Sequence, residues 1–255
     1  MDNTLIIVPC YNERNRLKTY EFNSFLKRNS HVSFIFVNDG STDNTNELIE
    51  TIKNVNPKRV EYLAFTQNRG KAEAVRNGVL RAIEDGARNI GYWDADLSTP
   101  LEFIDRMVER INEDITFVLG SRVKMLGCQI ERLPLRHYAG RLFATLASVI
   151  IDLPIYDTQC GAKIFRNNLE IQKAFSHPFT VNWSFDVELI ARLRIIKRAL
   201  GLRPLQESAK EYPLERWIHY EGSKVRAVDL LIGIKELLSL KVAIQSPKYV
   251  SNFIC

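Results

Sequence analysis

Short apolar runs recur along the first half of the chain, and each is followed by turn-forming residues. Runs of this length predict strands that are buried on both faces. Apolar residues at helical spacing lie between the runs, so strands alternate with helices. This alternation predicts an α/β fold with a mainly parallel sheet, right-handed crossovers and helices on both faces. The predicted strands span residues 4–9, 31–37, 60–65, 90–94 and 115–119.

Polar clusters directly follow four of these strands. They are Tyr11-Asn12-Glu13, Asp39-Gly40-Ser41, Asn68-Arg69-Gly70-Lys71 and Asp94-Ala95-Asp96. The carboxyl ends of parallel strands share one edge of a sheet, and ligands bind there. Mg²⁺ binds through one or two carboxylates plus substrate phosphates, so Asp94 and Asp96 are candidate metal ligands. The pattern predicts a nucleotide-phosphate crevice, although Asp94 and Asp96 alone would also fit a solvated turn that caps a helix.

The composition changes this picture little. The chain has 255 residues, of which 45% are hydrophobic and 25% charged, as is ordinary for a globular protein with a large core. A net charge of +5 fits a phosphate-rich substrate or an anionic membrane surface as well as nucleic acid. The cysteines show no metal-like spacing, which favours a reduced, cytoplasmic protein. The first residues lack a signal-peptide pattern, and no apolar run approaches the roughly 20 residues that span a bilayer.

Taken in order, the clusters resemble the successive motifs of family 2 glycosyltransferases with the GT-A fold. Motifs in the second half are similar to those of the polyprenyl-phosphate glycosyltransferases, nearest the dolichyl-phosphate beta-glucosyltransferase branch. These motifs are Gly120-Ser121-Arg122, Asp157-Thr158-Gln159-Cys160-Gly161-Ala162-Lys163-Ile164-Phe165, Trp183-Ser184-Phe185-Asp186-Val187-Glu188-Leu189 and Gly222-Ser223-Lys224-Val225. The resemblance covers residues 4–228.

The resemblance implies a role for each residue on the donor side. Asp96 would bind Mg²⁺ or Mn²⁺, which stabilises charge on the leaving diphosphate, and Asp94 would support the metal or the ribose. The other donor-binding positions that it implies are Pro9, Tyr11, Glu13, Asp39, Lys71, Ala95, Gln159 and Lys224. Asp39 would contact the nucleobase and Glu13 the ribose. A solvated first-turn lysine remains the alternative for Lys71, and a carboxylate at a helix N-terminus the alternative for Glu13.

The acceptor side depends on a basic patch between Arg122 and Arg141. It contains Arg122, Lys124, Arg132, Arg136 and Arg141 against one acid, Glu131. Arginine binds phosphate through two parallel hydrogen bonds, and the patch precedes an apolar run at 142–151. We therefore expect Arg122, Arg136 and Arg141 to bind an acceptor phosphate whose lipid tail stays in the membrane. A core helix with a solvated basic lead-in is the alternative.

Asp186 lies where many family 2 enzymes place a general base. A phosphate acceptor is already ionised at neutral pH, so we interpret Asp186 as a positioning or electrostatic residue and base catalysis as the lesser option. Asp186, Arg122 and Asp94 are the candidate catalytic residues. Cys160 is interpreted as a packing residue, because the expected reaction is a direct displacement with inversion.

These expectations define one hypothesis and two alternatives. The hypothesis is a metal-dependent transfer of a sugar, glucose by preference, with inversion, from a UDP-sugar to a dolichyl or undecaprenyl phosphate. The protein is expected to be peripheral and to act at the cytoplasmic membrane face. The alternatives are a saccharide or protein acceptor, and a non-catalytic nucleotide-sugar or anionic-lipid binder. Nucleic acid is not an expected partner.

The predicted catalytic domain spans 1–222, with a nucleotide-binding half at 1–120 and an acceptor-binding half at 121–222. Residues 223–255 are predicted as amphipathic helices for membrane contact, self-association or a membrane partner protein, with packing onto the sheet equally open.

Overall fold

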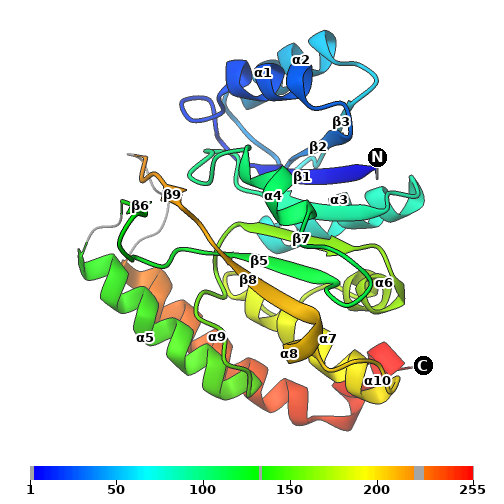
Figure 1. Cartoon of the computed structure of the whole chain (residues 1–255), viewed down its shortest axis with the longest axis vertical. Coiled ribbons are helices and arrows are strands. Elements are labelled where there is room, and N and C mark those ends of the chain that lie inside the picture. Colours follow the sequence, from blue (N-terminus) through cyan, green and yellow to red (C-terminus); the bar gives the residue numbers. More distant parts are fainter. Residues whose placement is uncertain (1–2, 132–133, 221–226, 255) are drawn as a thin grey trace.

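The computed structural model describes residues 3–131, 134–220 and 227–254, except for the side chains of 134–136 and 227–230. Its centre is a seven-stranded sheet (Figure 1). In spatial order the strands are β3 (Val60–Ala64), β2 (Val32–Asn38), β1 (Thr4–Cys10), β4 (Asn89–Trp93), β7 (Ala162–Arg166), β5 (Phe117–Ser121) and β8 (Ala209–Pro213). A short parallel pair, β6 (Gln129–Ile130) with β9 (Arg216–Trp217), lies apart from it.

The sheet is mainly parallel, as the sequence predicts. β3, β2, β1 and β4 run parallel to one another, and β5 runs parallel to β8. β7 inserts between β4 and β5 and is antiparallel to both. The pattern of apolar runs did not predict β7, because this short strand carries Lys163 at its second position. Its insertion separates β4 from the predicted fifth strand.

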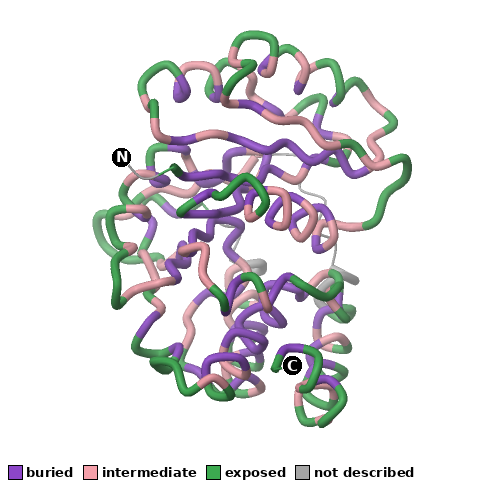
Figure 2. Tube along the Cα trace, turned by 90° about the vertical axis from the view of Figure 1, so that its right-hand side faces the viewer, coloured by how far each residue is buried: buried purple, intermediate pink, exposed green. Residues whose placement is uncertain are grey.

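Helices cover both faces of the sheet and divide the core in two. α1 (Thr19–Arg28), α2 (Thr45–Val55) and α4 (Phe103–Val108) enclose one cluster, which includes Phe34 and Phe36. α3 (Lys71–Glu84), α5 (Pro134–Ile151), α6 (Leu169–Ser176) and α7 (Phe185–Ala199) enclose the other, which includes Ile35 and Val37. Successive β2 side chains point to opposite faces, so both faces are apolar. Figure 2 shows the strands as a buried layer between these helices.

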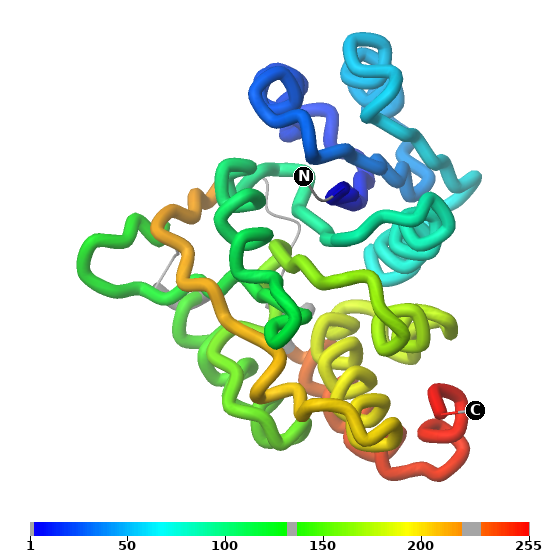
Figure 3. The backbone as a smooth tube through the Cα atoms, turned by 45° about the vertical axis from the view of Figure 1, so that its right-hand side comes forward, coloured from blue at the N-terminus to red at the C-terminus, as the bar shows by residue number. Residues whose placement is uncertain are grey.

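The C-terminal helices pack onto the second of these core clusters. α8 (Leu205–Ser208) precedes β8, and α9 (Ala227–Gln245) lies against α5 and α7. α10 (Pro247–Ile254) returns to α7, as the end of the chain shows in Figure 3. The predicted domain boundary after 222 lies outside the described residues. α9 buries Leu237 and Leu240 but exposes Leu238 and Val242, so its apolar residues are not confined to one side. Within the described residues, every helix is too short or too polar to cross a bilayer.

Candidate active site

Hydrogen bonds and ion pairs join the four polar clusters at the carboxyl edge of the sheet. The backbone N–H of Asn12, after β1, donates to Ser41 after β2 over 3.0 Å. The amide nitrogen of Asn68, after β3, lies 2.9 Å from the Asp39 carboxylate. Lys71 reaches Asp94, after β4, over 2.6 Å. The structure therefore brings together side chains that are far apart in the sequence.

Asp39 is held by the main chain of the neighbouring loop. Its carboxylate accepts the backbone N–H groups of Arg69 at 2.6 Å and Gly70 at 2.9 Å, and its side chain is almost fully buried. Burial raises the pKa of Asp39, and the two N–H groups and the charge of Arg69 oppose that rise. Gly40 has φ of +66°, and a Cβ there would lie 2.4 Å from the backbone of Gln67. A side chain at position 40 would therefore push the two loops apart.

Asp94 forms an ion pair with Lys71 and leaves part of its carboxylate open to solvent. Burial alone would raise the pKa of Asp94, but the positive charge of Lys71, with a contribution from Arg122, holds it below its usual value. Burial likewise opposes the charge on Lys71, and the carboxylates of Asp94 and Asp186 raise its pKa. Gly161 lies directly against Asp94: a Cβ at this position would be 1.8 Å from Oδ2. The close approach of the glycine backbone therefore fixes the position of Asp94.

Asp96 lies on the same turn, after the buried Ala95. One carboxylate oxygen accepts the backbone N–H of Ser98 at 3.0 Å, and the other lies 3.6 Å from a guanidinium nitrogen of Arg16. Leu97 has φ of +54°, a conformation that costs free energy for a residue with a side chain. The turn therefore holds Asp94 and Asp96 in a defined arrangement at the strand end.

The donor set fits a hard divalent cation held jointly with a substrate. In the described part of the chain no group of three or more His, Cys, Asp or Glu side chains could hold a metal ion by itself. Two carboxylates on one turn, Asp94 and Asp96, match the way in which Mg²⁺ is held through one or two carboxylates plus phosphate oxygens and water.

Among the remaining predicted donor residues, Glu13 is connected to this turn through Arg16, which also approaches Asp96. Glu13 is 6% exposed, its carboxylate lies 2.5 Å from Arg16, and its backbone N–H donates to Thr45. Pro9 is half-buried at the end of β1, and Tyr11 is exposed just beyond it. Gln159 donates to the Trp183 carbonyl over 3.5 Å. Lys224 lies outside the described residues.

Asp186 is buried at the second position of α7 and is surrounded by donors. It accepts a hydrogen bond from the Tyr92 hydroxyl, and Lys163 Nζ lies 2.5 Å from it. Lys163 also donates to the Cys160 carbonyl at 2.6 Å. Burial, together with the Asp186 charge, raises the pKa of Tyr92 well above its usual value, so its hydroxyl stays protonated and donates. Sequence reasoning missed Tyr92 and Lys163; the usable signal was a lysine within an apolar segment, because a buried lysine requires a partner.

Arg122 is bound by a carboxylate of its own chain. Its Nε and Nη2 lie 2.6 and 2.8 Å from the two oxygens of Asp157. Burial opposes the Arg122 charge, but Asp157 raises its pKa above the usual value. Glu211 in turn accepts the backbone N–H of Asp157 at 2.9 Å. The guanidinium group lies 5.5 Å above the Trp217 ring. Asp157 thus shows how Arg122 can bind two oxygens at once.

Arg141 lies beside the same segment. It donates to the Tyr156 carbonyl at 2.7 Å and stacks 3.5 Å above the Tyr156 ring. Residues 156–157 therefore connect Arg141 with Arg122. Arg136 belongs to α5, but its side chain lies outside the described residues. Burial raises the pKa of the Cys160 thiol to about 11, in agreement with a packing role.

Comparison with known proteins identifies the family. Residues 5–173 match the family model described as Glycosyl transferase family 2. The chain therefore belongs to glycosyl transferase family 2, as the motifs predict. Dolichyl-phosphate beta-glucosyltransferase of Saccharomyces cerevisiae is 31% identical over 98% of this chain and 77% of that protein. A UDP-N-acetylglucosamine--dolichyl-phosphate N-acetylglucosaminyltransferase of Methanococcus voltae is 25% identical, covering 93% of this chain and 95% of that one.

The fold is shared with a solved glycosyltransferase structure. Glucosyl-3-phosphoglycerate synthase from Mycobacterium tuberculosis, in complex with Mn²⁺, uridine-diphosphate and phosphoglyceric acid, superimposes with a TM-score of 0.67 at 16% identity. The match covers 95% of this chain and 78% of that chain. The prediction of a GT-A fold is confirmed, and the chain is a transferase by family.

Proposed function

We propose that the protein transfers glucose from UDP-glucose to a polyprenyl phosphate, with inversion and with the help of a divalent cation, at the cytoplasmic face of a membrane. One observation carries the proposal: Asp94 and Arg122 both contact the segment 157–161, Asp94 at Gly161 and Arg122 at Asp157. A donor held by the first would face an acceptor phosphate held by the second. The dolichyl-phosphate relatives supply the chemical class of the acceptor.

On the donor side, Asp96 and Asp94 would hold Mg²⁺ or Mn²⁺. The cation would supply positive charge for the diphosphate as the sugar bond breaks. Lys71 keeps Asp94 ionised and oriented. Asp39 and Glu13, at neighbouring strand ends, would bind the uridine. The remaining positions, Pro9, Tyr11, Ala95, Gln159 and Lys224, keep the proposed donor roles.

On the acceptor side, a phosphate oxygen would attack the anomeric carbon of glucose while the bond from that carbon to the diphosphate breaks. The electron pair leaves with UDP. Arg122 would bind two phosphate oxygens in the geometry it now uses for Asp157, and Arg141 and Arg136 would add positive charge. Because Asp186 already accepts from Tyr92 and Lys163, we assign it an electrostatic and positioning role, not that of the base.

Exposed apolar residues fit a lipid acceptor at a membrane surface. On α5 they are Tyr138, Leu142, Leu146 and Val149, and on α9 they are Leu231, Ile232, Leu238 and Val242. The two helices pack against each other. Exposed apolar surface on adjacent helices fits interfacial binding to lipid. This surface supports the proposed peripheral attachment.

The test is direct reconstitution. Purified protein, a polyprenyl phosphate in detergent and Mg²⁺ or Mn²⁺ are incubated with labelled UDP-glucose, and the organic phase is analysed for lipid-linked sugar. We expect glucosyl lipid that disappears with EDTA and in Asp96→Asn. If no sugar in a panel of nucleotide sugars reaches the lipid, the proposal is wrong. Product with a saccharide or protein acceptor instead would assign the same fold a different substrate.

UDP-N-acetylglucosamine is the second donor candidate, because the Methanococcus voltae relative carries that activity in its name. Competition between the two nucleotide sugars at equal concentration decides between them. A higher kcat/KM for UDP-N-acetylglucosamine would make that nucleotide sugar the proposed donor in place of UDP-glucose.

A further inference from the structure

The loop from Phe179 to Ser184 connects α6 to α7 and faces the proposed donor site. Phe179 to Asn182 line one side of a cleft of about 300 Å³, and Arg69, Ala72 and Glu73 line the other. The Asn182 side chain lies so close to Gly70 that a Cβ on Gly70 would be 2.4 Å from its oxygen. The loop therefore contacts Gly70, which donates its backbone N–H to Asp39 and directly precedes Lys71.

Two buried or half-buried carboxylates accept five consecutive backbone N–H groups of this loop. Glu188 accepts those of Thr180 and Val181 at 2.8 and 3.0 Å. Glu236 accepts those of Asn182, Trp183 and Ser184 at 3.1, 3.2 and 2.8 Å. A carboxylate has about four lone-pair sites, and backbone N–H groups without partners are costly when buried.

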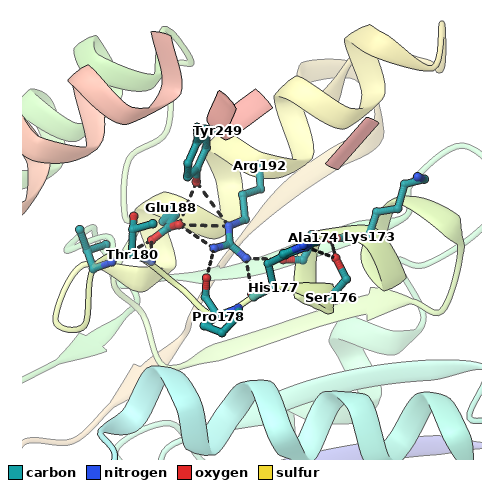
Figure 4. Close-up of polar contacts among 10 residues, drawn as sticks. Lys173, Ala174, Ser176, His177, Pro178, Thr180, Glu188, Arg192 and Tyr249 are labelled. Atoms are coloured by element: carbon teal, nitrogen blue, oxygen red, sulfur yellow. Dashed lines mark hydrogen bonds and ion pairs between the residues drawn. The ribbon is translucent and has the colours of Figure 1, made fainter. Parts of the chain in front are cut away.

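The two carboxylates belong to different parts of the molecule. Glu188 lies on α7 itself, and its other oxygen binds Arg192 at 2.7 Å and Tyr249 at 2.8 Å, as Figure 4 shows. Glu188 and Arg192 are fully buried, and Arg192 also donates to backbone carbonyls between α6 and α7. This network connects the first half of the loop to α7 and α10.

Glu236 belongs to α9, and α7 has no side-chain N-cap of its own. Ser184 occupies the N-cap position, yet its hydroxyl donates to Glu236 at 2.6 Å and caps nothing in α7. Trp183 is wedged beside α9 as well, because a Cβ on Gly233 would lie 2.3 Å from its ring. Trp183 also meets Phe143 of α5 edge-on at 5.1 Å. α9 thus anchors the three residues that immediately precede the helix that carries Asp186.

We propose that Glu236 is a positioning residue for the transferase reaction: it anchors Asn182–Ser184 and so sets the place of Asp186, two residues further on. Asp186 must meet both Lys163 and Tyr92, which belong to strands and do not move with α7. Release of Ser184 would let the first turn of α7 shift against them. The inference deepens the proposed function and rests on it for the identity of the reaction.

The experiment compares Glu236→Gln, Glu236→Asp and the control Lys235→Gln in detergent. Lys235 is the exposed neighbour of Glu236 on α9. The Gln variant has one acceptor oxygen in place of two. We expect kcat to fall about 10- to 100-fold, since a misplacement of about 1 Å has effects of this order, with the donor KM changed less than threefold. The kcat of Glu236→Asp should be at least threefold higher than that of Glu236→Gln, and the kcat of Lys235→Gln should equal that of the wild type.

A structural role alone would give a different result. If Glu236→Gln keeps kcat within twofold of the wild type, the inference is overturned. It is also overturned if Glu236→Gln and Glu236→Asp have the same lowered kcat, the same raised donor KM and the same lowered folded fraction. If Glu236→Gln does not fold, Ser184→Ala decides instead: a two- to fivefold lower kcat at unchanged donor KM supports the inference, and no change refutes it. A wild type that makes no lipid product refutes only the proposed function, and the same comparisons are then made on hydrolysis of the nucleotide sugar.

Discussion

Replacement of Gly161 by alanine tests whether backbone packing against Asp94 builds the donor site. The new methyl group would lie 1.8 Å from Oδ2 and 2.1 Å from Cγ of Asp94. Ordinary contact between such atoms requires about 3.5 Å, so the carboxylate or the β7 backbone must move by roughly 1.5 Å. The hydrogen bond from the Asp94 N–H to the Gly161 carbonyl, at 3.1 Å, leaves the backbone little freedom. Asp94 would therefore lose its 2.6 Å contact with Lys71.

The expected effect is functional more than structural. A shift of this size should lower kcat/KM on the order of 100-fold, whereas overpacking should lower the free energy of unfolding by about 1–3 kcal/mol. Transfer kinetics, UDP binding by calorimetry with Mn²⁺ and thermal unfolding measure the two effects separately. Gly86→Ala is the control for an added methyl group without a clash, because nothing lies within 4 Å of a Cβ there; its φ of +68° adds a backbone strain that is absent at Gly161. A Gly161→Ala enzyme with wild-type kcat/KM would refute the reasoning.

Three further changes test other contacts. Lys163→Met leaves the Asp186 carboxylate buried without its cation and should lower the free energy of unfolding in urea by about 3–5 kcal/mol; a loss below about 1 kcal/mol would contradict the pairing. The Cys160 pKa rises from 9.0 in the unfolded chain to about 11, so the contribution of the protonated thiol to the free energy of unfolding is complete below pH 9.0 and is lost towards pH 11. The difference in free energy of unfolding between the wild type and Cys160→Ala should therefore shrink over that interval, and a constant difference would contradict the raised pKa. Arg122→Lys keeps the charge but loses the paired hydrogen bonds, so the KM for the lipid phosphate should rise about tenfold while the donor KM is unchanged; an unchanged lipid KM would remove Arg122 from the acceptor site.

The strand ends could be predicted from the sequence because the relevant information is local. Each apolar run and the polar cluster after it are contiguous, and parallel geometry places all such ends on one edge. That reasoning leads to Asp39, Lys71, Asp94 and Asp96 without any knowledge of contacts. Family resemblance then supplied the fold, which the comparisons confirm. The roles of the individual residues stay predictions.

The missing parts of the site depend on pairs that are distant in the sequence. Asp186 meets Tyr92 across 94 positions, and Ser184 meets Glu236 across 52. Neither pair has a periodicity that a sequence pattern could show. Both depend on topology: β7 must run antiparallel beside β4, and α9 must fold back onto the start of α7. The local sign in the sequence was a lysine inside an apolar segment.

The charges in the described part of the site favour a divalent cation bound together with the substrates. Four basic side chains around the carboxyl edge each have a carboxylate partner. The pairs are Lys71 with Asp94, Arg16 with Glu13, Arg122 with Asp157 and Lys163 with Asp186. A nucleoside diphosphate would add negative charge to this balanced set, and a phosphate acceptor would add more. Arg122 can change partners, because its geometry suits phosphate as well as Asp157, but it serves one anion at a time. A divalent cation on Asp94 and Asp96 would balance the diphosphate and leave Arg122 for the acceptor, so the proposed metal dependence and the proposed acceptor role of Arg122 support each other.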